Sequence, residues 1–594
     1  MTAPIADSAD WRRSVTAGPL LRIFNDDGII DASDVIVAQR LSALAGECDE
    51  KVALALAFVV RAVRGGSVCL DLATLQQQVG SPELPWPEPA AWVAAVAASP
   101  LATAPTVLHL DEADGAGLLY LDRYWIEECR VAEDVRTLAA AERSGPAVDI
   151  ERLFPTAYAE QRGAAEVALS RGLTVLTGGP GTGKTTTVAR LLALLAEQAE
   201  SAGKPTLRIA LAAPTGKAAA RLLEAVKEEI SALDPVDRDR LPELRATTLH
   251  RLLGSRPDTS SRFRHNRDNR LPHDVIVVDE TSMVSLTMMA RLLEAVRPES
   301  RLLLVGDPDQ LASVEAGAVL ADLVDGLVDG GPIARLVTSH RFGASIGALA
   351  NAIRAGDSEA ALEVLVAGGP HIEWVDTDQP GVILRKVLVP HALALREAAV
   401  LGSDTEALRT LERHRMLCAH RRGPYGVDYW NRQTERWLAE QTDMPLWAPW
   451  YPGRPVLVTA NDYGLGLYNG DTGVAVLHDG VLRAVMSGAA GPVELATSRL
   501  ADIETMHAMT IHKSQGSQAV EVTVLLPSED SRLLTRELLY TAVTRAREKV
   551  RLIGTADQLR AAVDRRAMRA SGLARRLRSI ADRSTADRSI ADAE

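Results

Sequence analysis

The chain has 594 residues, of which 47% are hydrophobic and 24% charged, and 65 Lys and Arg against 78 Asp and Glu give a net charge of −13. This composition excludes a chain that is mainly disordered, collagenous or a disulfide scaffold, and the length predicts roughly four domains of about 150 residues each. The acidic total argues against indiscriminate coating of nucleic acid or membrane, but it leaves room for a local basic groove.

The start of the chain, MTAPIADSADWRR, lacks the basic and apolar runs of a signal peptide. The longest apolar stretch, 52–60, is too short to cross a bilayer. The four cysteines, Cys48, Cys69, Cys129 and Cys418, are too widely spaced for a CxxC metal or redox pair, so we expect buried, reduced thiols. These features predict a cytoplasmic protein without membrane association.

Residues 1–150 form the first predicted unit and are mostly typical of helices. Ala- and Val-rich segments with intervening polar positions predict helices over 52–63 and 90–98, and four prolines between 82 and 89 mark a loop. The unit contains neither a phosphate-binding loop nor a charge cluster. We therefore expect a helical packing or docking domain.

From about residue 151, short apolar runs alternate with helical stretches. Continuous Val, Leu and Ile runs are typical of strands buried on both faces, and their alternation with helices predicts parallel α/β sheets. Because one sheet cannot span the whole region, we expect two α/β units, 151–335 and 336–575. The predicted strands are 173–177, 207–213, 275–278, 302–305, 456–459, 522–526 and 550–553.

Three segments depart from this pattern. Residues 255–274 contain five Arg against three Asp and resemble a small basic insertion. Residues 452–491 include the turn pairs Asn469-Gly470 and Asp479-Gly480, which predict a small β-barrel inserted in the second unit. The repeat RSIAD-RSTAD-RSIAD, which begins at 578, predicts a low-complexity tail over 576–594.

The strongest motif, GGPGTGKT, runs from Gly178 to Thr185, directly after a predicted strand and at the start of a predicted helix. It matches the pattern GxxxxGK[ST], whose glycines let backbone N–H groups converge on phosphate oxygens at a helix N-terminus. We expect Lys184 to reach the β- and γ-phosphates and Thr185 to bind Mg²⁺. The residues expected to bind the nucleotide are Gly178, Gly179, Pro180, Gly181, Thr182, Gly183, Lys184, Thr185 and Thr186.

Two further apolar runs end in polar residues at the sheet edge that would face the phosphates. Asp279 and Glu280 follow the run 275–278; we expect Asp279 to hold Mg²⁺ through a water and Glu280 to polarise the attacking water. Gln310 follows the run 302–305 and could touch both the γ-phosphate and a domain interface. For a glutamine considered alone, a plain loop amide is the simpler interpretation.

The motifs together resemble those of superfamily 1 helicases. Six segments occur in the order of helicase motifs I to VI: GGPGTGKT, VVDETSM, VGDPDQLASV, HRF, TIHKSQGS and LYTAVTRAR. Two more segments, APTGKAA and TTLHRLLG, are similar to motifs Ia and Ib. Gln161 resembles the adenine-reading glutamine of the Q motif. Within the superfamily, TTLHRLLG, NDYGLGLYNGDTG, GGSVCLDL and LLYLDRYWIEE resemble the RecD family, the alpha subunit of exodeoxyribonuclease V.

This resemblance implies two RecA-like P-loop domains with an SH3-like β-barrel insertion and an N-terminal helical domain that docks onto partner subunits. It places Arg341 and Arg545 of the second domain at the γ-phosphate, so that hydrolysis is tied to domain closure. Gln518 stands where many relatives have an acid for the ribose. The residues implied to contact single-stranded DNA are Thr215, Lys217, Thr248, His250, Thr510, His512 and Ser514. Helix capping is an equally good interpretation of Thr215 and Thr248.

The resemblance implies an ATP-dependent 5′→3′ single-stranded DNA translocase and helicase. Its implied partners are RecB-like and RecC-like subunits, with which it would process double-strand breaks for recombinational repair. The chain has no separate nuclease motif, so nuclease activity would belong to the complex. Three alternatives stay open: a standalone 5′→3′ helicase, a non-catalytic regulatory subunit, and a nucleotide switch that does not bind DNA.

Overall fold

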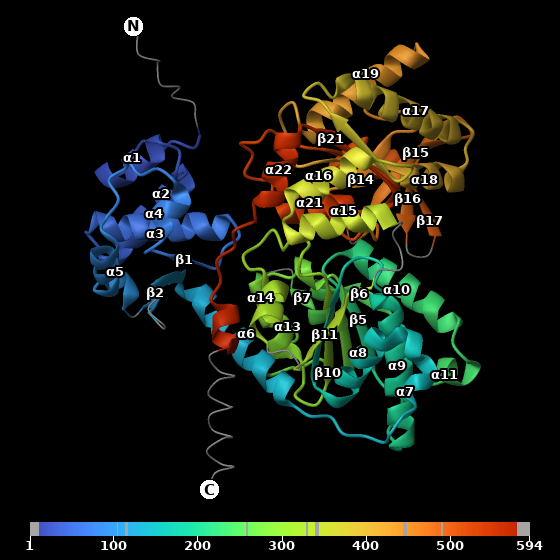
Figure 1. Cartoon of the computed structure of the whole chain (residues 1–594), viewed down its shortest axis with the longest axis horizontal. Coiled ribbons are helices and arrows are strands. Elements are labelled where there is room, and N and C mark those ends of the chain that lie inside the picture. The colour runs from blue at the N-terminus through green and yellow to red at the C-terminus, as the bar shows by residue number, and fades with distance from the viewer. Residues whose placement is uncertain are drawn as a thin grey trace.

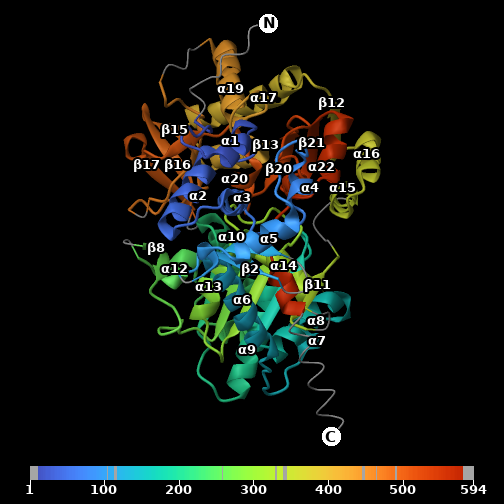
Figure 2. The same ribbon diagram turned by 90° about the vertical axis from the view of Figure 1, so that its left-hand side faces the viewer.

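A computed structural model of the chain describes residues 11–578 except 104, 113–116, 257–258, 328–330, 339–343, 444–447, 463 and 489–490. A small N-terminal part lies beside two larger α/β bodies, which we call lobe 1 and lobe 2 (Figure 1). Lobe 1 follows the N-terminal part in sequence, and lobe 2 follows lobe 1. The view from the side shows the N-terminal helices in front of both lobes (Figure 2).

The N-terminal part is built on helices, as predicted, and α3 and α5 are the two predicted helices. It also contains a three-stranded antiparallel sheet of order β1-β3-β2, whose short strands carry too little periodicity to predict. Phe24, Phe58, Trp86 and Trp92 pack against one another in its core. The elements are α1 (Pro19–Asp26), α2 (Ala32–Ala45), α3 (Glu50–Arg64), β1 (Cys69–Asp71), α4 (Leu75–Val79), α5 (Pro89–Ala97), β2 (Leu108–Asp111), β3 (Leu118–Leu121) and α6 (Asp122–Ala140).

Lobe 1 is a six-stranded parallel sheet of order β11-β4-β10-β9-β5-β6. Its strands are β4 (Leu173–Gly178), β5 (Ile209–Ala213), β6 (Ala246–Thr248), β9 (Val275–Val278), β10 (Arg301–Gly306) and β11 (Ile333–Leu336). Its helices are α7 (Ile150–Leu153), α8 (Ala159–Ser170), α9 (Lys184–Ser201), α10 (Gly216–Ser231), α11 (Pro235–Asp239), α12 (Leu249–Leu253), α13 (Leu286–Ala295) and α14 (Val319–Gly326).

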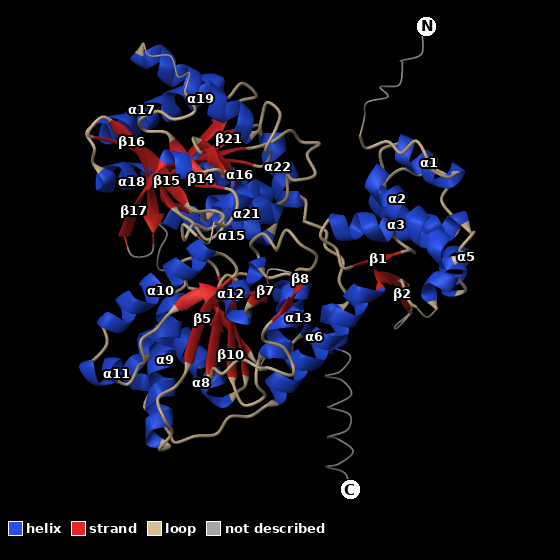
Figure 3. Ribbon diagram, turned by 180° about the vertical axis from the view of Figure 1, so that it is seen from behind, coloured by secondary structure: helices blue, strands red, loops and turns tan. Residues whose placement is uncertain are grey.

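The central strands of lobe 1 are buried on both faces, as their continuous apolar runs predict. Leu302 and Leu304 of β10 belong to a core that includes residues of α13 and α14, whereas Leu303 and Val305 belong to a core with residues of α8 and α9. The strands are drawn between these helix layers in the view coloured by secondary structure (Figure 3). Because β4 and β9 both pair in parallel with β10, the carboxyl ends of these three strands lie side by side.

Lobe 2 is a five-stranded parallel sheet of order β12-β21-β20-β13-β19. The prediction of two parallel α/β units is therefore confirmed. The strands are β12 (Ile372–Asp376), β13 (His414–Cys418), β19 (Ala508–Thr510), β20 (Ala519–Leu525) and β21 (Ala546–Gly554). The helices are α15 (Ala344–Ala355), α16 (Ser358–Ala367), α17 (Gly381–Val400), α18 (Asp404–Arg413), α19 (Val427–Thr442), α20 (Ile511–Ser514), α21 (Arg536–Val543) and α22 (Ala556–Asp564).

An antiparallel sheet of order β17-β16-β15-β14-β18 is inserted in lobe 2. The predicted strand 456–459 belongs to this insertion, because β14 pairs antiparallel with β15 and β18. Asp479 and Gly480 form the β15–β16 turn with positive φ values of 48° and 81°, as predicted. No ladder in the described ranges joins β17 to β18, so the sheet seen here is open. The strands are β14 (Pro455–Val458), β15 (Thr472–His478), β16 (Val481–Gly488), β17 (Gly491–Ala496) and β18 (Ile503–Thr505).

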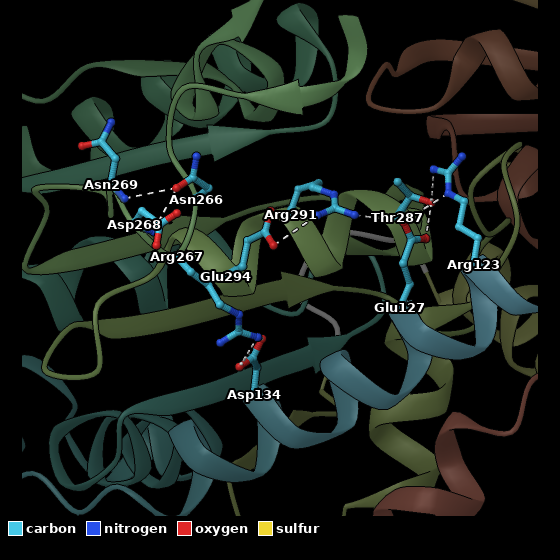
Figure 4. A network of polar contacts seen from close by, with 10 residues as sticks. All are labelled: Arg123, Glu127, Asp134, Asn266, Arg267, Asp268, Asn269, Thr287, Arg291 and Glu294. Atoms are coloured by element: carbon cyan, nitrogen blue, oxygen red, sulfur yellow. Dashed lines mark hydrogen bonds and ion pairs between the residues drawn. The ribbon is translucent and has the colours of Figure 1, made fainter. Parts of the chain in front are cut away.

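Helix α6 connects the N-terminal part to lobe 1. Its residues Val131, Val135 and Leu138 are buried in the lobe 1 core. Glu127, with only 3% of its side chain exposed, accepts hydrogen bonds from Thr287 at 2.7 Å and from Arg291 at 3.1 Å, both on α13 (Figure 4). A helical pattern could not show which core this helix joins.

The predicted basic insertion forms a short hairpin, β7 (Ser255–Arg256) with β8 (Thr259–Phe263), followed by turns. Arg267 from these turns donates to both carboxylate oxygens of Asp134 on α6, at 3.0 and 2.7 Å (Figure 4). Part of the positive charge of this segment is therefore neutralised within the protein.

The predicted tail begins too early at residue 576. Leu577 is buried in the lobe 1 core, and Arg576 donates to Glu128 of α6 at 2.9 Å. Apart from its first residue, Arg578, the repeat lies outside the described residues. Apolar residues before the repeat explain this difference, because they continue the lobe 1 core.

The expectation of buried thiols holds for two of the four cysteines. Cys69 and Cys418 are buried, Cys129 is half-buried and Cys48 is exposed. Among the described helices, none combines the length and the apolar content that crossing a membrane requires.

Candidate nucleotide and nucleic-acid sites

The phosphate-binding loop lies between β4 and α9, in the predicted strand–loop–helix order. Gly181 and Gly183 have φ values of 81° and 84°, a region that favours glycine. The Lys184 ammonium donates to the carbonyls of Gly178 and Gly179, at 2.6 and 2.9 Å. Thr182 closes the loop through a 2.9 Å hydrogen bond to the Gly179 carbonyl. The lysine is thus held over the loop at the start of α9, where the helix N-terminus favours an anion.

Asp279 and Glu280 follow β9 on the same sheet edge. Glu280 has a φ of 51°, which is strained for a residue other than glycine, and Thr281 anchors the turn through a 3.0 Å bond to the Val278 carbonyl. Burial and the neighbouring Glu280 raise the pKa of Asp279. Two adjacent carboxylates in a partly desolvated place fit a divalent cation that would neutralise their charge.

Gln310 is more than a plain loop amide, because it bridges the two lobes. Its amide N–H donates to Asp307 at 2.9 Å, and its carbonyl accepts a 2.9 Å bond from the Arg545 guanidinium of lobe 2. Tyr540 of α21 also donates to Asp307, at 3.1 Å. Gln310 and Arg545 are only 6% and 4% exposed, so this contact is shielded from water.

A second pair of bonds joins the lobes one residue further along the chain. The Leu311 N–H donates to the Thr541 hydroxyl at 2.9 Å, and the Leu311 carbonyl accepts a 2.9 Å bond from Gln515. Sequence reasoning missed Gln515, Tyr540 and Thr541, although all three lie inside the quoted motifs. The loop after β10 is therefore gripped on its backbone as well as on its side chain.

The phosphate-binding loop, the two carboxylates after β9 and Gln310 line one cleft of about 1510 Å³. On the lobe 1 side, the lining residues include Lys184, Thr185, Asp279, Glu280 and Gln310. Lobe 2 contributes Gly516, Gln518, Arg545 and Arg547. The structure thus brings Arg545 and Gln518 to the predicted nucleotide site, whereas Arg341 lies outside the described residues.

The end of the cleft near α8 contains Gln161, which is 5% exposed and donates to the Thr182 carbonyl at 3.4 Å. Two lining residues there were not predicted. The Arg190 guanidinium lies 4.8 Å from the ring centre of Tyr158. An aromatic residue three positions before Gln161 was the available signal for this platform.

Three of the predicted DNA-contact residues cap helices. The hydroxyls of Thr215, Thr248 and Thr510 accept from backbone N–H groups of α10, α12 and α20, at 3.2, 3.2 and 3.3 Å. Each threonine stands where the chain leaves a parallel strand, two in lobe 1 and one in lobe 2. The capping interpretation of Thr215 and Thr248 is confirmed, and Thr510 caps α20 in the same way, so that three helices start at the carboxyl ends of strands in the two sheets.

The remaining predicted contacts differ in accessibility. His250 is exposed and lies edge-on to Phe263, with 5.8 Å between ring centres. Desolvation and then Arg569 lower the pKa of His512. Ser514 is 1% exposed and donates to the Ile511 carbonyl at 2.7 Å, so in this conformation its hydroxyl serves the fold. Because the burial of Ser514 depends on tertiary packing, the sequence does not show that its hydroxyl is taken up by this bond.

Comparison with known proteins decides the family. A model of the RecBCD enzyme subunit RecD N-terminal domain matches residues 26–113, an AAA domain model matches 161–316, and a UvrD-like helicase C-terminal domain model matches 505–553. The RecBCD enzyme subunit RecD of Mycolicibacterium smegmatis is 69% identical over 550 residues, which cover 93% of this chain and 98% of that protein. The chain belongs to the RecD family.

More distant relatives agree with this assignment. RecD of Mycobacterium tuberculosis is 65% identical over 95% of this RecD-family chain and 98% of its own length, and RecD of Haemophilus influenzae is 32% identical over 78% and 81%. The RecD2 DNA helicase of Deinococcus radiodurans is 32% identical over 79% of this chain but over only 59% of its own length. The predicted family and its nucleotide-dependent helicase activity are therefore confirmed.

Proposed function

We propose that this chain is the 5′→3′ single-stranded DNA motor of a heterotrimer with RecB-like and RecC-like subunits, which processes double-strand breaks in the cytoplasm for recombinational repair. The observation that carries the proposal is the bond between Arg545 and Gln310 inside the cleft that contains Lys184 and Glu280. An arginine supplied across two lobes stabilises transition-state charge only while the cleft is closed. Hydrolysis is thereby tied to lobe movement.

The lining residues have distinct roles in ATP hydrolysis. Lys184 and the loop N–H groups bind the phosphates, and Glu280 orients the attacking water and accepts its proton as the bond between the γ-phosphorus and ADP breaks. Arg545 stabilises the charge that develops on the γ-phosphoryl group. Thr185 and Asp279 would hold Mg²⁺, which supplies neutralising charge at the phosphates.

The Tyr158 ring, the Arg190 guanidinium and Gln161 form the base-binding end of the cleft. A flat aromatic ring held beneath a guanidinium offers a stacking surface, and the Gln161 amide offers both a donor and an acceptor to the adenine edge. Gln518 lies on the lobe 2 side, where it can hydrogen-bond the ribose.

The three capped helix starts suit a strand that runs across both lobes. Hydroxyls and helix-terminal N–H groups contact phosphates without reading bases. Thr215, Thr248 and His250 would hold the strand on lobe 1, and Thr510 and His512 on lobe 2. Opening and closing of the lobes would then alternate the two grips and move the strand.

The proposed domains follow from the same elements. Residues 1–150 would dock partner subunits, residues 151–335 and 336–575 would be the motor domains, and the SH3-like insertion would lie at about 452–491, within the region of the sheet from β14 to β18. The RecD N-terminal model matches residues 26–113, which supports a subunit over a standalone helicase. The alignment with the D. radiodurans RecD2 helicase covers only 59% of that protein, so RecD2 contains a large region that this chain does not match.

Unwinding by the co-purified complex tests this function. A duplex with a 5′ overhang should be unwound by wild-type complex in an ATP-dependent manner, and Lys184→Gln should abolish this 5′→3′ component. Equal unwinding by both complexes would show that the chain is a non-catalytic subunit. Undiminished unwinding by the isolated chain would show a standalone helicase.

A further inference from the structure

A loop of the inserted sheet, residues 464–472, lies on the top of lobe 1. The Tyr468 ring packs directly on Gly216, the first residue of α10: a Cβ atom at Gly216 would lie 2.6 Å from Tyr468 Cγ and 2.8 Å from Tyr468 Cβ. Only a residue without a side chain accepts this approach. The ring therefore covers the helix start that follows Thr215.

The same loop holds a basic side chain from each of the other two capped helix starts. Arg251 of α12 donates to the Tyr468 hydroxyl at 3.3 Å, and Lys513 of α20 donates to the side-chain amide oxygen (Oδ1) of Asn469 at 2.5 Å. Arg251 belongs to lobe 1 and Lys513 to lobe 2. One loop thus connects three helix starts on two lobes, and both acceptors are uncharged.

The loop keeps its shape through its own contacts. Asp462 and Leu467 exchange backbone hydrogen bonds at 2.9 and 3.0 Å, and the Tyr468 N–H donates to Asp471 at 2.8 Å. Leu467 is 5% exposed and belongs to the core of the inserted sheet. These contacts tie the loop to itself and to the core of the inserted sheet.

We propose that residues 464–472 are a latch that holds α10, α12 and α20 together in the DNA-free chain, and that single-stranded DNA displaces it. The inference rests on the proposed path of the strand over these helix starts. Phosphate oxygens are stronger acceptors for Arg251 and Lys513 than a phenol or an amide. Because the lobes must change their spacing in each catalytic cycle, a latch across them restrains turnover until a strand is bound.

Lys217 gives independent support from beneath the latch. Its ammonium donates to the Thr472 hydroxyl at 3.4 Å, at the end of the loop. Desolvation and the nearby Arg415 and Arg221 lower the pKa of Lys217 to about 7. Removal of the latch would rehydrate this ammonium and restore its charge for a phosphate.

Three substitutions in the full-length chain release the latch from different sides. Tyr468→Ala removes the ring, Gly216→Ala inserts a methyl group where the ring lies, and Asn469→Ala removes the acceptor of Lys513. We expect each to raise ATP turnover without DNA several-fold and to strengthen binding of an oligothymidylate. Val481→Ala, at an exposed position on β16 of the same sheet, is the matched control and should leave both values unchanged.

Unchanged DNA-free turnover in all three variants would overturn the latch, as would weaker oligothymidylate binding, which would make the loop a strand contact instead. Failure of the proposed function has a different signature: wild-type turnover would not respond to oligothymidylate at all. In that case, faster turnover of the three variants would still establish the latch as a restraint on the lobes.

Discussion

The Arg545 guanidinium of lobe 2 donates a 2.9 Å hydrogen bond to the side-chain amide oxygen of Gln310 in lobe 1, at a position where both side chains are almost fully buried. Gln310 is in turn held by Asp307 at 2.9 Å. This chain of contacts connects the strand end beside the phosphate loop to the second lobe. A nucleotide bound in the cleft would therefore contact residues of both lobes.

Arg545→Ala should remove the charge that closes the cleft. We expect ATP binding to persist and DNA-stimulated kcat to fall by about 10³-fold or more, as is typical when an arginine supplied across a cleft is lost. Steady-state ATPase assays and a nucleotide-binding titration would measure the two effects. Arg560→Ala, which breaks an exposed ion pair with Glu359, is the control and should change neither value.

Tyr158→Ala should weaken ATP binding by removing the ring beneath Arg190. Stacking of a base on an aromatic ring is worth about 1–3 kcal/mol, so we expect KM for ATP to rise roughly 5- to 150-fold with little change in kcat. Tyr158→Phe keeps the ring and should behave like the wild type. A loss of kcat at unchanged KM would show that the ring does not bind the base.

Binding of single-stranded DNA should depend on pH through Lys217. Desolvation, Arg415 and Arg221 lower its pKa to about 7, against the opposing effect of Asp471 and Glu412. Because the phosphate-bound form is protonated, binding above pH 7 takes up a proton, and affinity should fall by up to about tenfold per pH unit. Lys217→Arg stays charged and should flatten the profile between pH 7 and 9. Parallel profiles for the two proteins would exclude this role.

Two histidines in lobe 2, His507, which is buried, and His391, which is partly exposed, should make the fold sensitive to acid. Burial and then nearby arginines lower the pKa of His391 to about 4, and burial, His391 and Arg454 lower that of His507 to about 3. The unfolded chain, with a histidine pKa near 6.5, takes up protons first as the pH falls. The stability that the neutral histidines provide is therefore complete above pH 6.5 and falls below it, by about 2 kcal/mol for each residue at pH 5.

Melting temperatures measured between pH 7.5 and 5 would show this decline. His507→Gln cannot be protonated and should reduce the slope, although it starts from a lower melting temperature because it loses the 2.9 Å bond to Tyr451. His371→Gln, at an exposed position, should keep the wild-type slope. A wild-type slope in the His507→Gln protein would contradict the assignment.

The parts of the site that sequence predicts well are local. Lys184 and Asp279 each follow an apolar strand within a few residues, so a run of strand, loop and helix fixes their position on the sheet edge. Gln310 and Arg545 are 235 residues apart, and their contact depends on how two separate lobes pack. The order of the motifs predicts that both residues belong to one site, but it does not predict the hydrogen bond between them.

Other features depend on tertiary packing that periodicity does not encode. Nothing local to residues 122–140 shows that Val131 and Val135 of α6 join the core of lobe 1 rather than that of the N-terminal part. Tyr468 and Arg251 meet across 217 residues, in a segment whose turn residues predicted only a β-structure. Ser514 is among the predicted DNA contacts, because the sequence does not show that residues distant in the chain bury its side chain.

Turnover by Glu280→Gln tests the central claim most directly, since this change keeps the size of the side chain and removes only the group that accepts the proton of water. ATP hydrolysis by wild-type protein and variant should be measured with and without an oligothymidylate, together with binding of both ligands. We predict that the variant binds ATP and DNA like the wild type and hydrolyses ATP slower by orders of magnitude. Wild-type turnover in the variant would contradict the assignment of this cleft as the motor's ATPase site.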